Sequence, residues 1–365
     1  MTPAKHLIEP FISQNTEPSY ALSEKDLETS GLMQEATQER PFNSTVKEIK
    51  RIDGLGDKET YLVSLRVNES WSFEPGKAIG VIVKNCDELV QRAKSKYHTS
   101  HPNMTLHNLD LTGQPKHHLL KRLGIEAEDI KGYGLIDMNC EDILVSEFGH
   151  LAPRYYSICN SPLAQPGVVQ FVFNVSEIRN AEGELIRLGA GSSFLRQLKK
   201  GDKLPIFPRA IDSGFKLPPA EQLTPTTPLI MVCAGTGVAP FIGFLQHLEH
   251  TRLTPETHLF FGVRNSDYIF KDQLSEFERK GVLRRLVLAT SREAPQQYVQ
   301  DVIDGEWLYE KMSGNPLARI YICGDEMTMV KAVNTLIQQT CEKHGNSKLI
   351  HEWSKAKRIL RDIWI

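Results

Sequence analysis

Apolar and polar residues alternate over short stretches in residues 41–84 and again in 150–218, which is the pattern of β-strands. Between these segments, in residues 85–149, leucine and isoleucine recur at helical spacing, which predicts a small helical insert. Strands on both sides of one insert predict a single antiparallel β-barrel that is interrupted once. The predicted strands are 46–52, 61–67, a turn and strand over 73–83, 155–159 and 168–175.

Beyond a Thr- and Pro-rich linker, residues 219–365 change to strict alternation of strand and helix patterns. The predicted strands are 229–234, 258–263, 283–290 and 319–323, and the predicted helices are 240–250, 270–280, 298–312 and 327–343. Such alternation predicts a parallel sheet with helices on both faces. We therefore expect two domains, an antiparallel β-barrel with a helical insert and then an α/β domain, preceded by a loose polar tail over residues 1–40.

Composition and charge exclude several classes of protein. The chain has 365 residues, 40% of them hydrophobic, and a formal net charge of −2, so no electrostatic footprint for nucleic acid or an anionic membrane is visible. An uncharged run at 229–245 contains a glycine turn and a proline, and is typical of a buried strand followed by a helix. The N-terminus lacks the apolar core of a secretory signal. We therefore expect a cytoplasmic protein.

Cysteine and histidine spacing gives no sign of a metal centre or of a disulfide framework. No two of the cysteines are close in sequence, and reduced thiols in the cytosol are the better interpretation. His247 and His250 lie three apart on a predicted helix without a third ligand, which favours a surface face over a metal site. The six cysteines are Cys86, Cys140, Cys159, Cys233, Cys323 and Cys341.

The ends of the four predicted parallel strands carry residues suited to a phosphate ligand. They are Gly235-Thr236-Gly237, Gly262-Val263-Arg264, Ser291-Arg292 and Cys323-Gly324-Asp325. Ligands bind outside the carboxyl ends of strands in open parallel sheets, where glycines permit close backbone approach and arginines hold anions. One such turn alone is as consistent with an ordinary strand-to-helix connection, but four agreeing strand ends predict a dinucleotide site.

The first turn departs from the GxGxxG fingerprint of dinucleotide-binding dehydrogenases. Pro240 stands in place of the third glycine, and proline suits the first turn of a helix. Arg264, and no acidic residue, ends the second strand, so a ribose hydroxyl has no carboxylate partner there. Ser291 and Arg292 suit the 2′-phosphate of NADP, although Arg292 taken alone is also consistent with a solvated surface charge.

A second candidate site lies in the barrel half. In Gly189-Ala190-Gly191-Ser192-Ser193, small residues lead into a short helix whose amides could hold a pyrophosphate; the alternative is plain capping of that helix by its serines. Arg154-Tyr155-Tyr156-Ser157 places a cation, two rings and a hydroxyl on one strand, with Arg154 and Tyr156 on the same face. An ordinary barrel strand is the alternative here.

Taken in order, these motifs resemble the FAD/NADPH half of the diflavin reductases, a ferredoxin-NADP reductase-like group. The resemblance covers nearly everything from residue 42 onward. Two strings, 235–247 and 360–364, resemble methionine synthase reductases in particular. The resemblance implies the cofactors FAD and NADPH, with 41–84 and 150–218 as the FAD-binding barrel, 85–149 as a connecting insert and 219–365 as the NADP(H)-binding domain.

The resemblance also implies roles for residues at the flavin. Arg154 is expected to hold an FAD phosphate, and Tyr156 to stack on the flavin ring. Ser157, Cys323 and Asp362 are the implied catalytic set around the hydride path, with Ser157 near the flavin N5. Trp364 is expected to cover the flavin face that the nicotinamide must reach. The residues expected to line the FAD pyrophosphate are Gly189, Gly191 and Ser192.

For the coenzyme, the resemblance implies that Thr236 and Arg264 contact the NADPH phosphates. The residues expected to hold the 2′-phosphate are Ser291, Arg292, Tyr298 and Gln300. Two departures concern these sites. Gln296 and Gln297 stand where the family has a basic residue, which weakens the expected grip on the 2′-phosphate. Ile178 stands where relatives often have an aromatic residue, which puts adenine stacking in doubt.

The sequence holds no flavodoxin-like FMN domain, which precedes this module in the family. We therefore expect single electrons to pass from FAD to a separate partner, flavodoxin-like or cobalamin-binding, most directly to reactivate cobalamin-dependent methionine synthase. One alternative is a ferredoxin-NADP reductase-type enzyme that serves another carrier. Another is a non-catalytic chaperone or scaffold for a cobalamin protein, but such a scaffold has no need of Ser157, Cys323, Asp362 and Trp364.

Overall fold

The computed structural model contains both predicted kinds of sheet, one antiparallel and one parallel, and the chain divides into two compact units. Unit 1 comprises Met1–Val46, Gly80–Tyr155 and Val175–Pro208, and unit 2 comprises Lys47–Ile79, Tyr156–Asn174 and Arg209–Ile365. The predicted tail and nearly all of the predicted helical insert lie outside the described residues, so the domain boundaries stay predictions. The structure describes residues 41–53, 58–69, 71–87, 89–91, 95, 151–180, 182–209, 214–266 and 268–364.

The barrel half forms an antiparallel sheet of six strands in the order β4-β3-β8-β1-β2-β5. Within unit 1, β1 pairs with β8 from Phe42 opposite Ile206, and within unit 2, β2 pairs with β5 from Thr60 opposite Asn174. The predicted strands are confirmed, and β8 is an addition. The strands are β1 (Phe42–Arg51), β2 (Thr60–Arg66), β3 (Ala78–Val81), β4 (Arg154–Ser157), β5 (Val168–Asn174) and β8 (Lys203–Pro208).

Unit 1 also contains a two-stranded ribbon and a short helix. The ribbon pairs β6 (Glu177–Arg179) with β7 (Leu185–Leu188). Helix α6 (Ala190–Gln197) follows directly, and its apolar residues Phe194 and Leu195 are buried. Small residues lead into this short helix, as the sequence predicts.

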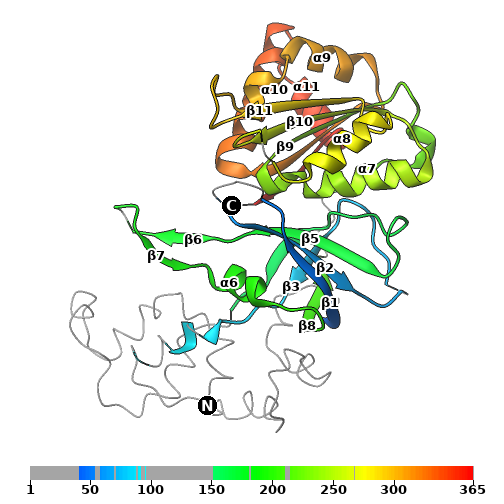
Figure 1. Cartoon of the computed structure of the whole chain (residues 1–365). Helices are drawn as coiled ribbons and strands as arrows, with labels where there is room; N and C mark the ends of the chain where they lie inside the picture. Colours follow the sequence, from blue (N-terminus) through cyan, green and yellow to red (C-terminus); the bar gives the residue numbers. More distant parts are fainter. Residues whose placement is uncertain are drawn as a thin grey trace, which may run out of the picture. The chain divides into compact units, whose positions relative to one another are not determined.

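The second half is a five-stranded parallel sheet in the order β11-β10-β9-β12-β13 (Figure 1). The chain starts at the central strand β9, builds one side of the sheet and then crosses to the other, so a switch point lies between β9 and β12. This confirms the predicted α/β fold, and β13 is a fifth strand that the pattern did not predict. The strands are β9 (Pro228–Ala234), β10 (Glu256–Val263), β11 (Arg285–Thr290), β12 (Arg319–Asp325) and β13 (Ile359–Trp364).

Helices cover both faces of this sheet (Figure 1), and successive side chains of β9 pack against opposite faces. Met231 and Cys233 pack in one apolar cluster with residues of α7 (Ala239–Thr251) and α8 (Lys271–Arg279). Ile230 and Val232 pack in a second cluster, with residues of α9 (Gly305–Gly314), α10 (Lys331–Lys343) and α11 (Leu349–Lys355). A strand buried on both faces reads as a continuous apolar run, which explains the uncharged segment at 229–245.

Two predicted helices have different boundaries in the structure. The prediction of one helix over 298–312 is wrong, because a short 3-10 turn, η7 (Val299–Val302), precedes α9. The Asp304 carboxylate accepts hydrogen bonds from the amides of Glu306 and Trp307, at 2.9 and 3.3 Å, and so starts a new helix. The predicted helix at 327–343 begins instead with a π-helical turn, η8 (Glu326–Val330), ahead of α10.

Across the described ranges of the chain, none of the helices has the length and apolar character that a membrane span requires.

Candidate functional site

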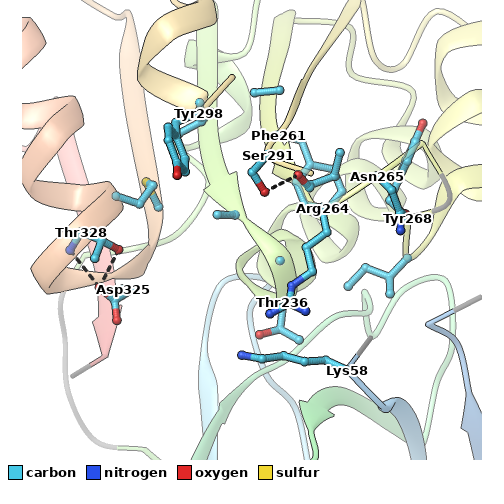
Figure 2. Close-up of a pocket in the computed structure, with 18 of the residues that line it drawn as sticks. Lys58, Thr236, Phe261, Arg264, Asn265, Tyr268, Ser291, Tyr298, Asp325 and Thr328 are labelled. Atoms are coloured by element: carbon cyan, nitrogen blue, oxygen red, sulfur yellow. Dashed lines mark hydrogen bonds between the residues drawn. The ribbon is translucent and has the colours of Figure 1, made fainter. Parts of the chain in front are cut away.

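A cavity of about 700 Å³ lies at the carboxyl ends of the parallel strands in unit 2 (Figure 2). The strand ends and the turns that follow them supply most of its lining, from Ala234–Thr236 after β9 to Asp325 at the end of β12. This is the edge at which the sequence predicted a dinucleotide. Five of the six predicted coenzyme-binding residues line the cavity: Thr236, Arg264, Ser291, Tyr298 and Gln300.

The turn after β9 owes its shape to Gly235, whose φ of 53° lies in the left-handed region. It continues as a 3-10 turn, η6 (Gly235–Val238), into α7, where Pro240 lies in the first helical turn, as predicted. Thr236 is thereby placed on the cavity wall at the beginning of a helix. Backbone amides at such a helix start favour a phosphate group.

The turn after β11 is tied to the end of β10 by hydrogen bonds. The Ser291 amide donates to the Val263 carbonyl at 2.9 Å, and its hydroxyl donates to the same oxygen at 3.2 Å (Figure 2). The Arg292 amide donates to the Arg264 carbonyl at 2.8 Å. The Arg292 side chain is exposed and is not among the described residues that line the cavity, so Ser291 and Arg292 differ in position.

Tyr298 stands at the opening of the same cavity, with 61% of its surface exposed. Its backbone is fixed, because its amide donates to Asp301 at 2.8 Å and the Asp301 amide donates back to its carbonyl at 2.9 Å. Gln297 also lines the cavity, and its amide donates to Thr290 at 2.9 Å. Gln297 therefore adds an uncharged side chain to this part of the lining.

Lys58 also lines this cavity, together with Thr236 and Arg264 (Figure 2). Lys58 was not among the site residues predicted from the sequence. It lies in the connection between β1 and β2, far from the strand-end motifs in sequence. Its carbonyl accepts a hydrogen bond from the Thr60 hydroxyl at 3.1 Å, and the Thr60 amide donates to Asp53 at 3.1 Å. These bonds hold the connection, and Lys58 adds a second cation to a cavity suited to phosphate.

We expect Lys58→Ala to raise the KM for NADPH about tenfold, which corresponds to the loss of roughly one charge-assisted hydrogen bond. The KM for NADH should rise by the same factor, because both coenzymes share the pyrophosphate that this lysine is placed to contact. Steady-state kinetics with each coenzyme measure the two factors. A loss confined to NADPH would place Lys58 at the 2′-phosphate instead.

Ser157, Cys323 and Asp362 meet in unit 2, although Ser157 and Asp362 are 205 residues apart in sequence. The parallel register of β12 and β13 places Cys323 opposite Asp362. The Ser157 hydroxyl donates to Asp362 Oδ2 at 2.6 Å, and the Cys323 Sγ lies 3.9 Å from the same oxygen. The three residues that the resemblance groups as catalytic therefore contact one another, while their roles stay predictions.

Burial governs the protonation of this cluster. It raises the pKa of Asp362, whereas the Ser157 hydrogen bond, the positive charge of Arg209 and the hydrogen bond from Cys323 act in the opposite direction. Burial also raises the pKa of the Cys323 thiol well above its ordinary value, and the charge of Asp362 adds to that effect. Cys323 is therefore a neutral thiol near neutral pH, able to donate a hydrogen bond but not to act as a thiolate.

Two of the predicted FAD contacts lie together in unit 1 and fit a phosphate-bearing group. A Cβ added at Gly191 would lie 3.1 and 3.2 Å from Cγ and Nε of Arg154, so glycine permits this close approach. The Arg154 guanidinium is oriented by a 2.6 Å hydrogen bond from NH1 to the Ala152 carbonyl. No side chain caps α6, so the start of this helix keeps the positive end that favours an anion.

The alternative interpretation of this segment, that its serines cap α6, is wrong. Gly189 is the N-cap and has extended backbone. The Ser192 hydroxyl donates to the Gly189 carbonyl at 3.1 Å and accepts from the Ser176 amide at 3.0 Å, so it holds the preceding chain. A buried serine with both functions used supports the loop, and the helix amides remain the candidate contact for pyrophosphate.

Two aromatic residues complete the set expected at the flavin. In unit 2 the Tyr156 ring stacks on Phe171, with centroids 4.8 Å apart and planes at 25°. Trp364 ends β13, where its backbone pairs with Asp325, and its side chain lies outside the described part of the chain. The expected flavin contacts of both residues stay predictions.

Comparisons with known proteins agree with this geometry. Residues 231–335 match the model of the oxidoreductase NAD-binding domain. The chain is 37% identical to the NADPH–cytochrome P450 reductase of Dictyostelium discoideum over 60% of its own length and 35% of the relative's. It is 35% identical to human methionine synthase reductase over 61% of its length and 37% of the relative's.

A third relative aligns over more of the chain. The sulfite reductase [NADPH] flavoprotein alpha-component of Vibrio parahaemolyticus is 27% identical over 90% of this chain and 59% of its own length. The chain thus spans between about a third and three fifths of these three relatives. The antiparallel sheet and the parallel α/β sheet give the chain the ferredoxin-NADP reductase-like fold, and the chain is similar to a part of each of these reductases.

Proposed function

We propose that this chain is an NADPH-dependent flavoprotein oxidoreductase, which accepts a hydride from NADPH on bound FAD and passes the electrons to a separate acceptor protein. The observation that carries the proposal is the contact of Ser157, Cys323 and Asp362, which the fold assembles from three distant segments. FAD supplies two-electron acceptance and the release of electrons one at a time. Relatives named for NADPH and as a flavoprotein support this chemistry.

The chain's own residues bind and orient the reactants. Thr236, Arg264 and Lys58 are placed to hold the coenzyme phosphates, and Ser291 to contact the 2′-phosphate. Asp362 accepts a hydrogen bond from the Ser157 hydroxyl. The lone pairs of the Ser157 oxygen can then accept from a neighbouring donor. Cys323 is fully buried and Asp362 is mostly buried, and a low-dielectric surrounding strengthens the electrostatic interactions inside the cluster.

As the acceptor, we propose a protein that needs single electrons for reductive repair of its cobalamin, such as cobalamin-dependent methionine synthase. The strings at 235–247 and 360–364 and the 35% identity with human methionine synthase reductase support this choice. The similar identity with a cytochrome P450 reductase leaves a second candidate, a reductase for another carrier.

The test of the proposed reaction is spectroscopic. The purified chain should be yellow, contain about one FAD and no FMN, and lose its flavin absorbance when NADPH is added without oxygen. It should reduce ferricyanide, a small acceptor that can approach the flavin edge. A chain that does not take up FAD, or whose flavin NADPH leaves unchanged, would be a scaffold and not a reductase.

The acceptor is tested separately. Cytochrome c should be reduced slowly by this chain alone, and faster when a flavodoxin-like or cobalamin-binding partner is added. Methionine synthase in its inactive cobalt(II) state should regain activity when NADPH, this chain and a flavodoxin-like carrier are added. Fast cytochrome c reduction without a partner would contradict the proposed handover while leaving the flavin reaction intact.

A further inference from the structure

A second, smaller cavity of about 220 Å³ adjoins the catalytic carboxylate in unit 2. Asp362 lines this cavity, and it does not line the coenzyme cavity at the strand ends. The walls are formed by the Gly76–Ala78 segment, by Arg209 and by residues of β13, including Arg361 and Ile363. Three cations therefore line the cavity with one partly buried carboxylate, and none of them is among the described residues that line the coenzyme cavity.

The two oxygens of Asp362 face different partners. Oδ2 accepts the Ser157 hydroxyl at 2.6 Å and lies 3.9 Å from the Cys323 sulfur. Oδ1 lies 3.9 Å from NH1 of Arg209. The Asp362 side chain is 14% exposed and that of Arg209 is 28% exposed, so solvent only partly screens this ion pair.

The cations around the cavity are not equivalent. Arg361 directly precedes Asp362 in β13, but its guanidinium donates to Asn334 Oδ1 at 2.7 and 3.3 Å. Lys77 lines the same cavity. The backbone of Arg209 is fixed beside Ala78, because the Arg209 amide donates to the Ala78 carbonyl at 2.9 Å. The Arg209 guanidinium itself approaches the carboxylate, with NH1 3.9 Å from Oδ1 of Asp362.

We infer that Arg209 is a positioning residue for the proposed reductase reaction, which keeps the Asp362 carboxylate ionised and turned so that Oδ2 holds Ser157. The role in the reaction rests on the proposed function, whereas the ion pair between Arg209 and Asp362 is a feature of the structure itself. Without an opposing charge, burial favours the neutral acid, since a low-dielectric surrounding disfavours the charged form. A protonated Asp362 is no longer a charged acceptor, so it holds the Ser157 hydroxyl more weakly than the carboxylate does.

The groups facing Asp362 all enter the balance of its ionisation. Ser157 and Arg209 favour the carboxylate, and the Cys323 thiol donates to it while remaining neutral. Arg361 and Lys77 also line the cavity, and the Arg361 guanidinium donates to Asn334. An opposite charge within about 4–6 Å lowers a carboxyl pKa by about 1 to 3 units, so the Arg209 contribution is measurable.

The test is an infrared titration of the Asp362 carboxyl in the full chain with FAD bound, assigned by subtracting the spectrum of Asp362→Asn. Arg209→Gln should move the midpoint upward by about 1 to 2 pH units. Arg209→Lys, which keeps the charge, should leave it near the unmutated value. The matched control is Arg361→Gln, which removes a cation from the same cavity and should not move the midpoint.

Kinetics give the second readout. In Arg209→Gln the acidic limb of the kcat profile should shift to higher pH by the same amount, with KM for NADPH unchanged at the plateau. If Arg209→Gln does not fold, Arg209→Met keeps the aliphatic stem and is titrated in its place. An unmoved midpoint in a folded variant overturns the inference. Absence of NADPH oxidation by the unmutated chain would instead overturn the proposed function, because the infrared midpoint is measured without turnover.

Discussion

Replacing Arg292 with alanine should remove most of this protein's preference for NADPH over NADH. Charged hydrogen bonds to a 2′-phosphate are worth about 2–4 kcal/mol over a bare hydroxyl. That corresponds to a preference of about 30- to 1000-fold in kcat/KM, which the variant should largely lose. The measurement is kcat/KM for each coenzyme in the unmutated chain and in Arg292→Ala.

The structure refines this expectation. The Arg292 side chain is exposed and outside the cavity lining, while its backbone amide is fixed to Arg264. Its guanidinium is therefore free to extend over a phosphate at the cavity edge, where Ser291 and Tyr298 stand. Because it is exposed, its loss should leave the melting temperature unchanged.

The matched control for Arg292 is Lys58→Ala, which should weaken both coenzymes equally. The ratio of their kcat/KM values then separates a 2′-phosphate contact from a pyrophosphate contact. Equal use of NADPH and NADH by the unmutated chain would exclude the 2′-phosphate role of Arg292. A large loss with NADH in Arg292→Ala would assign the residue to a phosphate that both coenzymes share.

The α/β half could be predicted from the sequence because its strands are apolar runs with a helical pattern after each. Strand β13 could not, since Arg361 and Asp362 interrupt its apolar pattern. Tertiary contacts resolve that conflict: Asn334 accepts from Arg361, and Ser157 donates to Asp362. A strand whose charges find partners only in the folded chain has no local signature.

Some residues of the candidate site could likewise be predicted from the sequence and others could not. The strand-end residues could be located because parallel strands bring their carboxyl ends to one edge, and five of the six expected coenzyme residues line one cavity there. Lys58 and Arg209 could not be located, because each lies in a connection with no motif around it. Their places depend on hydrogen bonds of the folded chain, from the Thr60 amide to the Asp53 carboxylate and from the Arg209 amide to the carbonyl of Ala78, which is distant in sequence.

The second large effect is expected at Asp362. Asp362→Asn should slow the bleaching of the flavin by NADPH by about 10²- to 10³-fold, the cost typical of removing one electrostatic group from a catalytic site. The amide keeps the shape of the side chain, but it carries no charge and can donate to Ser157 where the carboxylate only accepted. The rate is measured anaerobically by stopped flow, with KM for NADPH expected to stay nearly constant.

Stability should move independently of this rate. Burial raises the pKa of Asp362 above its unfolded value, so the ionised form costs folding free energy at any pH above that value. The contribution of Asp362 to stability should therefore fall as pH rises from the ordinary pKa of an aspartate through the higher pKa of Asp362 in the folded chain. Asp362→Asn should not show this loss, and the melting temperature of this variant at neutral pH should be unchanged or higher.

The matched control is Asp304→Asn, which keeps an N-cap on α9 and should leave the bleaching rate unaltered. A carboxylate whose removal slows the reaction while the fold gains or keeps stability is retained for chemistry. A slowing of less than about threefold would show that Ser157 needs no negative partner, and would confine Asp362 to the packing of β13 against β12.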